Sequence, residues 1–534
     1  MIKFFCSTCI IISVFSIGMA QENALSLLDS NRLERSGSNH LVKVEIDASQ
    51  TYQTIHNFGA SDAWSIQFVG KNWPESSKKQ IADLLFSRAL KKDGSPKGIG
   101  LSAWRFNIGA GSMEQGEASD IKNQWRRTES FLDSVGNYNW NAQSGQVWFL
   151  KQAQKMGVNN FVGFVNSPPV HLTKNNKAFS QDGLSANIGS ENYSKYAQFL
   201  VKVIQGIKEN AGVKLNYVSP FNEPQWKWKC CNQEGSPWNN DEIATMTKIL
   251  NDSLSKQGLE TKIELTEAGQ IDYLFSDFKD ENRGDQINVF FNPSSKNYLG
   301  NLSHVAKKVV GHSYFSTWPT DRLVRTRKLL AQKIEETNSN LEYGMSEYTL
   351  LENNEEVKGK GRDLEMAPAL YMARVLHADL TIANATFWHW WLAVSPYNYK
   401  DGLIYIDKKK DGGEIFESKL LWTLGHYSRF IEPGMIRIGT DYASDVPEHE
   451  KINGLLCSAY QSKSGNKIVL VFTNQLNEDK IIQLSGVSKQ FEKMKLYITS
   501  ESPHDNLRFI GEYSKNQTVS LPKRSLITCV FETN

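Results

Sequence analysis

The sequence lacks a net charge of either sign and, beyond its first residues, lacks long apolar runs. Lys and Arg number 60 and Asp and Glu 58 among 534 residues. Nucleic acids and anionic membranes are bound through concentrated basic surfaces, so this balance argues against both as partners. No run after residue 20 reaches the roughly 20 apolar residues that a spanning helix needs. We therefore expect no membrane insertion.

Cysteine is also scarce. Two of the six cysteines lie in the first twenty residues, which leaves Cys230, Cys231, Cys457 and Cys529. Four cysteines in so long a chain do not make a disulfide framework. Cys457 and Cys529 lie in strand-like runs and could form one bridge or remain two buried thiols. Adjacent Cys230 and Cys231 lack the C-x-x-C spacing of a zinc site, and the ten histidines are scattered, so we predict no metal site.

Residues 1–20, "MIKFFCSTCIIISVFSIGMA", have the pattern of a secretory signal peptide. One lysine precedes an apolar run, and the small residues Gly18 and Ala20 come just before a polar stretch. The apolar run is shorter than a membrane span. We expect export across the inner membrane, to the periplasm, the cell surface or the medium.

Between about residues 51 and 430, short apolar runs alternate with helical segments, such as residues 191–212 and 241–258. This order implies parallel strands joined by helical crossovers. Eight such units predict a (β/α)8 TIM barrel. A doubly wound open sheet is the alternative, but no glycine-rich phosphate loop follows any run. The eight runs are 54–64, 100–111, 159–169, 215–224, 262–269, 308–316, 341–350 and 385–394.

From residue 431 to 534 the pattern changes to short alternating strands separated by Gly, Ser, Asn and Lys turns. Such alternation is typical of an antiparallel β-sandwich. The early segment 41–50 alternates in the same way and precedes the first barrel run. We expect it to join the C-terminal β-sandwich domain.

Four acidic residues lie at the carboxyl ends of the barrel runs: Asp62, Glu223, Glu267 and Glu347. Chemistry in a (β/α)8 enzyme is placed at that rim. Burial would raise the pKa of one carboxyl group while nearby donors keep another ionised, and two such carboxyl groups can hydrolyse a glycosidic bond. The alternative is that these acids cap helices or pair with arginines.

The motifs at these positions resemble glycoside hydrolase family 30, in the clan of retaining (β/α)8 hydrolases. "SPFNEP" around Glu223 and "MSEY" around Glu347 are similar to its acid/base and nucleophile motifs. Five further motifs occur along the chain in the order typical of the family: "NFGASDAW", "WRFNIGAG", "NSPP", "GHSYF" and "WHWWLAVSP". The resemblance covers nearly the whole mature chain. The longer pattern "NEPQWKW…QEGSPW" resembles the endo-β-1,6-galactanase branch.

The resemblance implies a role for each matching residue. Glu223 would be the acid/base and Glu347 the nucleophile, Asn222 would bind the sugar 2-hydroxyl, and Arg105 would keep the nucleophile ionised. His312 and Tyr314 would brace the site from the sixth strand. Further substrate contacts are expected from Asp62, Asn166, Trp226 and Trp390, with Trp228 and Trp388 as weaker candidates. Glu267 is expected to belong to the scaffold or to a subsite.

A secreted retaining hydrolase of β-1,6-galactan, the side chains of arabinogalactan, is thus the function that the resemblance implies. It would need no cofactor, and its partner would be a polysaccharide or oligosaccharide; a monomer is favoured. β-1,6-Glucanase, xylanase and exo-acting β-glycosidase activities remain open. A non-catalytic glycan-binding protein would usually have lost one of the two glutamates, and a metal-dependent hydrolase would need clustered ligands.

Overall fold

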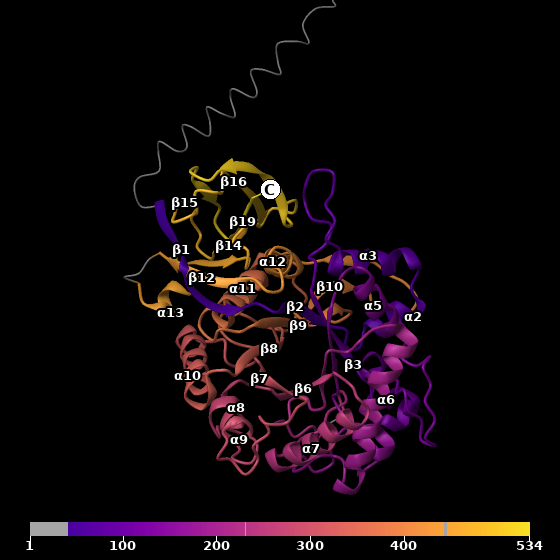
Figure 1. The fold of residues 1–534 in the computed structure, drawn as a ribbon. Coiled ribbons are helices and arrows are strands. Elements are labelled where there is room, and N and C mark those ends of the chain that lie inside the picture. The colour runs from indigo at the N-terminus through magenta and orange to yellow at the C-terminus, as the bar shows by residue number, and fades with distance from the viewer. Residues whose placement is uncertain (1–40, 230, 443–445, 534) are drawn as a thin grey trace, which may run out of the picture.

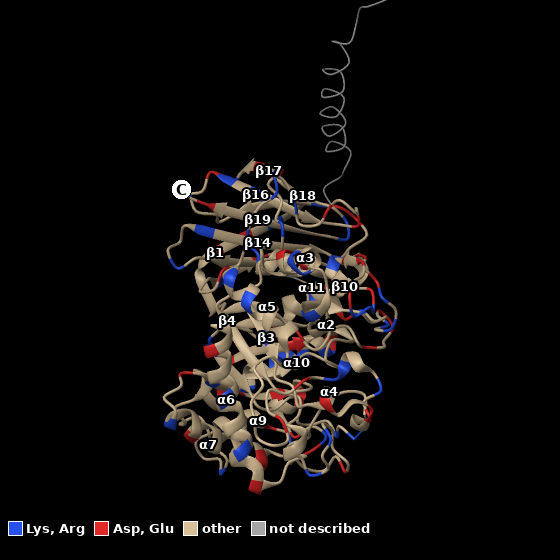
Figure 2. Ribbon diagram, turned by 90° about the vertical axis from the view of Figure 1, so that its right-hand side faces the viewer, with Lys and Arg blue, Asp and Glu red and all other residues tan. Residues whose placement is uncertain are grey.

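The computed structural model describes residues 41–229, 231–442 and 446–533. The expected signal peptide and Cys230 lie outside the described residues. Within those ranges, no helix is both long and apolar enough to cross a bilayer. Figure 2 shows Lys and Arg interspersed with Asp and Glu over the molecule, in keeping with the balanced composition.

Eight parallel strands close into a barrel, because β9 pairs with both β8 and β2. Each overlaps one of the eight predicted runs, so the predicted TIM barrel is confirmed. The hairpin of β10 (Gly402–Ile406) and β11 (Ile415–Glu417) extends the sheet beyond β9. The barrel strands are β2 (Asn57–Ser61), β3 (Ala103–Asn107), β4 (Asn160–Phe164), β5 (Tyr217–Ser219), β6 (Lys262–Ala268), β7 (Val305–His312), β8 (Glu342–Tyr348) and β9 (Phe387–Ser395).

The strands are buried on both faces, which is why they read as apolar runs rather than as alternating ones. All nine residues of β9 are buried. Helices cover the outside of the barrel (Figure 1). α6 (Tyr193–Ala211) ends where Gly212 takes a left-handed φ of 73°, and α7 (Asn240–Lys256) begins with a capping box of Asn239 and Glu242. The other helices are α2 (Ile66–Asn72), α3 (Glu75–Phe86), α4 (Ser112–Gln115), α5 (Ser144–Lys155), α8 (Asp272–Phe275), α9 (Gln286–Phe291), α10 (Thr320–Asn338), α11 (Met366–Thr381), α12 (Lys419–Ser428) and α13 (Glu448–Lys451).

A second, nine-stranded sheet lies beside the barrel (Figure 1). Its order is β17-β16-β19-β14-β13-β12-β1-β15-β18, so its strands form one hydrogen-bonded sheet with its own apolar core. The N-terminal strand β1 (Leu41–Thr54) pairs antiparallel with β12 and parallel with β15. The predicted fold class, a barrel with an attached antiparallel β domain, is confirmed. The remaining strands are β12 (Ile436–Asp441), β13 (Leu455–Gln461), β14 (Lys467–Asn474), β15 (Lys480–Ser485), β16 (Lys493–Thr499), β17 (Arg508–Ser514), β18 (Val519–Leu521) and β19 (Ser525–Glu532).

Helix α12 fastens the sheet to the barrel. His426 is fully buried, and its two ring nitrogens lie 2.7 Å and 2.9 Å from the hydroxyls of Thr528 and Thr499. Burial lowers the pKa of His426 to about 3, so the ring is neutral in this contact. Buried hydrogen bonds of His426 therefore help to join the two parts.

Cys457 and Cys529 are both free thiols in the core of the second sheet. Burial raises the pKa of each well above its ordinary value. Thiolates are the reactive form, so these two cysteines are inert packing residues. Of the two alternatives that the sequence left open for them, the structure favours buried thiols.

Candidate active site

Three of the four strand-end acids meet at one rim of the barrel. Glu267 lies on β6 and Glu347 on β8, while Glu223 comes four residues after the end of β5. His312, the last residue of β7, lies between them: its Nδ1 is 3.0 Å from Glu223 Oε1 and its Nε2 is 2.9 Å from Glu267 Oε2. The carboxyl ends of parallel strands share a rim, so residues far apart in sequence form one cluster.

Arg105 on β3 is the second cation of the cluster and is only 1% exposed. Its Nη1 donates to Glu347 Oε2 at 2.5 Å, and its Nη2 donates to Asn222 Oδ1 at 3.0 Å. Nη2 also lies 3.3 Å from Glu267 Oε2. The guanidinium carbon is 3.8 Å from the centroid of the Phe164 ring. Arg105 therefore orients the two predicted motifs relative to each other.

Glu267 is more central than the sequence suggested. The hydroxyls of Ser219 and Ser346 donate to its two carboxylate oxygens at 2.6 and 2.7 Å, in addition to the contacts with His312 and Arg105. Burial raises its pKa, but Arg105 and His312 outweigh that effect and hold the pKa well below its usual range. Glu267 is a permanent anion that orients both cations.

The charges of the cluster shift the pKa values of His312 and Glu347. Burial alone would lower the pKa of His312, but Glu347, Glu223 and Glu267 raise it to about 10. Burial raises the pKa of Glu347, with Glu223 acting in the same direction and His312 and Arg105 opposing it. Two cations and the Glu267 anion leave one positive charge to balance. Arg105 and His312 thus oppose the effect of burial and favour the ionised form of Glu347.

The backbone at two of these acids is strained. Glu223 and Glu267 have φ values of 45° and 40°, in the left-handed region that residues with a Cβ rarely adopt. The two are linked, because the Glu223 N–H donates to the Glu267 carbonyl at 2.9 Å. Strain of this kind costs of order 1–3 kcal/mol per residue and clusters at functional sites. Here this backbone conformation places the carboxylates of Glu223 and Glu267 against the two ring nitrogens of His312.

One oxygen each of Glu223 and Glu347 and a ring nitrogen of His312 lie within 4.8 Å of one another. Such a triad has the spacing of metal ligands. Both His312 nitrogens, however, face carboxylates, and the raised pKa keeps the ring doubly protonated, so it has no lone pair to offer. The donor set fits an ion-paired network better than a metal.

A cavity of about 350 Å³ opens above the cluster. Of the predicted residues, it is lined by Asn222, Glu223, Trp226, Tyr314 and Glu347. The Tyr314 hydroxyl donates to Glu347 Oε1 at 3.2 Å. The cavity therefore gives a ligand direct access to both carboxylates, between aromatic walls.

Three predicted binding residues lie away from this cavity. Asp62 is buried and accepts from the Asn107 N–H at 2.8 Å. Both polar side-chain atoms of Asn166 are buried without a partner among the described residues. Trp390 is fully buried, and its indole N–H donates to the Asp401 carbonyl at 2.8 Å.

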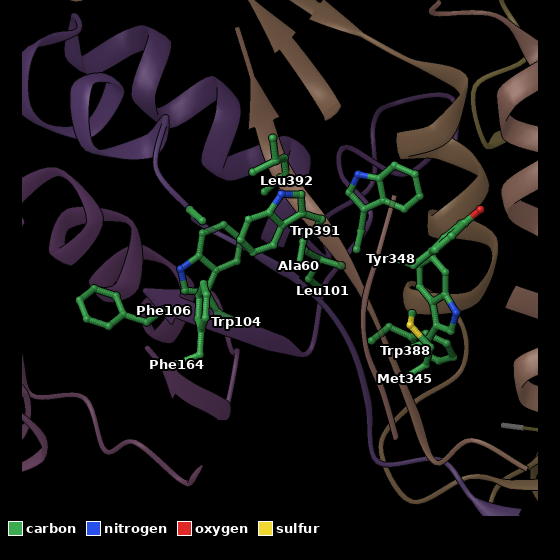
Figure 3. Close-up of a cluster of buried hydrophobic side chains, with 14 of the residues drawn as sticks. Ala60, Leu101, Trp104, Phe106, Phe164, Met345, Tyr348, Trp388, Trp391 and Leu392 are labelled. Atoms are coloured by element: carbon green, nitrogen blue, oxygen red, sulfur yellow. The ribbon is translucent and has the colours of Figure 1, made fainter. Parts of the chain in front are cut away.

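The neighbouring Trp391 lines the cavity in place of Trp390. The pairing of β9 with β2 shifts register between Trp390 and Leu392, which turns Trp391 inward. In Figure 3 Trp391 lies near Leu392 and on the side of Phe164, whereas Trp388 lies beside Tyr348. The other lining residues that the sequence did not single out are Gln233, Phe315, Leu351 and Glu352; Trp228, a weaker candidate, also lines it.

The buried Asp62 predicts a pH dependence of stability. Burial raises its pKa from 3.8 to about 8, so the folded protein binds this proton when the unfolded chain has released it. The stability that Asp62 contributes is full below pH 3.8 and is lost as the pH rises to about 8. Asp62→Asn removes the titration, so we expect denaturant unfolding to show a smaller loss of stability between pH 4 and 8 than in the wild type. An identical loss in both proteins would contradict the assignment.

The chain is similar to known glycoside hydrolases. The model of O-glycosyl hydrolase family 30 matches residues 41–405. An endo-β-1,6-galactanase of Hypocrea rufa is 25% identical over 412 residues, which cover 74% of this chain and 76% of the galactanase.

Two solved structures share the whole architecture. A conserved exported protein from Bacteroides fragilis superposes with a TM-score of 0.86 at 36% identity, covering 91% of this chain and 99% of its own. The catalytic domain of a family 30 xylanase C from Talaromyces cellulolyticus superposes with a TM-score of 0.65 at 22% identity. The match covers 92% of this chain and 100% of the xylanase chain. Since the family model spans most of the chain, the protein belongs to O-glycosyl hydrolase family 30 and is a glycoside hydrolase.

Proposed function

We propose that the protein is a retaining hydrolase of β-1,6-galactan, with Glu347 as nucleophile and Glu223 as general acid/base. The observation that carries the mechanism is the approach of the two carboxylates, which have one oxygen each within 4.8 Å. Retaining enzymes hold the two carboxyl groups about 5–5.5 Å apart, whereas inverting enzymes leave about 6.5–9.5 Å for a water.

The contacts of the two acids distinguish their roles. Glu347 receives two hydrogen bonds, from Arg105 at 2.5 Å and from Tyr314 at 3.2 Å. Arginine stays charged at all relevant pH values, so this contact favours the ionised form of Glu347. Glu223 has no contact with Arg105 among the bonds of the cluster and faces His312 alone. Glu223 is therefore the proton donor in this proposal.

The reaction proceeds in two displacements. The Glu347 carboxylate attacks the anomeric carbon while Glu223 gives its proton to the leaving oxygen, which breaks the glycosidic bond. Glu223, now ionised, takes a proton from water; the water oxygen attacks the anomeric carbon and releases Glu347. The first-formed sugar keeps the configuration of the substrate.

The choice of galactan rests on the similarity to the galactanase of Hypocrea rufa and on the "NEPQWKW" loop. Trp226, Trp228 and Trp391 give the cavity aromatic walls, which suit the apolar faces of pyranose rings. We also propose export through residues 1–20, in keeping with the likeness to a conserved exported protein.

Product analysis on β-1,6-galactan, β-1,6-glucan and xylan tests the substrate. We expect kcat/KM on galactan to exceed that on the other two by at least about tenfold, or 1.4 kcal/mol. A higher kcat/KM on glucan or xylan would contradict β-1,6-galactan as the substrate and leave the proposed mechanism unchanged. Binding of a glycan without hydrolysis of any of the three would contradict the enzymatic proposal and favour a glycan-binding role.

A further inference from the structure

The catalytic cavity continues into a second hollow. This outer hollow, of about 470 Å³, is lined by Trp226, Gln270, Phe278, Lys279, Phe315 and Arg322. Trp226 and Phe315 line both spaces. Their rings meet edge to face, with centroids 6.0 Å apart and planes at 82°. The two spaces are thus one cleft divided by an aromatic ridge of Trp226 and Phe315.

Three aromatic residues of this cleft have backbone conformations that are costly for a residue with a Cβ. Among the described residues other than glycine, thirteen have positive φ, and the aromatic ones are Trp228, Phe278 and Phe315. All three line the cleft. Phe278 and Phe315 are also 40% and 55% exposed, so each leaves apolar surface in water as well. Bulky residues at positive φ are genuine outliers, and such strain is kept where a side chain is needed for function.

The walls of the outer hollow are fixed rather than loose. Phe315 is anchored through its carbonyl, which accepts from Arg322 Nε at 3.1 Å. Arg322 is itself held by both carboxylate oxygens of Asp272, at 2.9 and 3.0 Å. Trp226 packs over Gly269, where an added Cβ would lie 2.4 Å from its Nε1. Phe278 packs edge to face against Tyr273, with centroids 5.1 Å apart.

The ridge is attached to the acid/base side of the site. Trp226 follows Glu223 by three residues, and the backbone N–H of Trp226 donates to the Glu223 carbonyl at 3.1 Å. In the proposed mechanism Glu223 protonates the leaving oxygen, so the part of the glycan that departs lies on this side. Trp391, which lies near Arg105 and Phe164, lines the inner cavity but not the outer hollow.

We infer that the outer hollow binds the leaving part of a β-linked glycan, one sugar unit beyond the unit joined at the cleaved bond. Trp226, Phe315 and Phe278 stack on its sugar faces, and Lys279 donates to its hydroxyls. Lys279 Nζ lies over the Phe278 ring, 4.8 Å from its centroid, so the ammonium group and the aromatic ring line the same part of the hollow. The inference rests on the proposed function and implies cleavage within a chain.

Chain-length kinetics test this assignment. The probes are β-1,6-linked galacto-oligosaccharides of increasing length and an aryl β-galactoside, which ends at the cleaved bond. We expect wild-type kcat/KM to rise with length. Phe278→Ala should lower the ratio of kcat/KM on the longest oligosaccharide to that on the aryl galactoside at least about tenfold, since stacking on one ring contributes energies of this order. Lys279→Ala should lower the same ratio by a smaller factor.

Two further variants serve as controls. Leu329→Ala on α10 removes an apolar side chain that is 41% exposed, close to the 40% of Phe278, and should leave the ratio unchanged. Phe278→Gly tolerates the positive φ and should lower the ratio while folding normally. A Phe278→Ala enzyme with the chain-length dependence of the wild type would overturn the inference alone. A wild type that cleaves none of the probes would overturn the proposed function and this inference together.

Discussion

Replacement of Glu347 by glutamine should lower kcat/KM on the best glycan by at least about 10³-fold, which corresponds to about 4 kcal/mol of lost transition-state stabilisation. Glutamine cannot form the covalent bond to the anomeric carbon. The loss should be as large on an aryl glycoside with a good leaving group, because that substrate needs the nucleophile just as much. Steady-state kinetics on both substrates measure it.

Glu223→Gln gives the contrasting pattern. General acid catalysis contributes about 10²–10⁴-fold, so the loss on the glycan should fall in that range. The loss on an activated aryl glycoside should be smaller, since its leaving group needs little protonation. Glu342→Gln, at the opposite end of β8 from Glu347, is the matched control and should keep wild-type activity. If Glu347→Gln rather than Glu223→Gln showed the smaller loss on the aryl glycoside, the nucleophile and acid/base roles would be exchanged. Wild-type activity in either variant would refute the assignment of the catalytic pair.

Arg105→Met should have the largest effect on stability. The change leaves the buried carboxylates of Glu347 and Glu267 without their guanidinium partner, and breaking a buried pair in this way costs about 3–5 kcal/mol. Denaturant unfolding at neutral pH measures the free energy of unfolding. Lys328→Met, which removes a largely exposed partner of Glu448, should change it little.

The pH dependence of this effect follows from Glu267. Its pKa in the folded protein is depressed, so the stability it contributes is present above its unfolded pKa and is lost as the pH falls through the folded pKa. In Arg105→Met the depression is weaker, and acid neutralises the unpaired carboxylates. The difference in the free energy of unfolding between wild type and variant should therefore become smaller toward acidic pH. A variant within about 1 kcal/mol of wild type at neutral pH would show that the cluster does not depend on this cation.

The barrel and its carboxylate rim could be predicted from the sequence because both follow from local patterns. Strands buried on both faces produce apolar runs, and parallel strands bring their carboxyl ends together. The sequence therefore predicts Glu223, Glu267 and Glu347 as strand-end acids, although spacing alone does not show that Glu267 orients the two cations.

The rest depends on geometry that has no local signature. The choice between Trp390 and Trp391 was set by a register shift in β9, which alternation along the strand does not reveal. Phe315 and Phe278 lie in loops, and their exposure and positive φ become visible only in three dimensions. The outer hollow combines the loops that follow β5, β6 and β7, whose relative placement no single segment encodes.

Identification of the residue that carries the covalent intermediate tests the central claim most directly. A 2-deoxy-2-fluoro glycoside with a good leaving group slows breakdown of the glycosyl-enzyme, so peptide mass spectrometry can locate the label. The geometry predicts one sugar per protein, bound to Glu347. A label on Glu223 or Glu267, or turnover with inverted configuration and no labelled peptide, would contradict the double displacement proposed for this site.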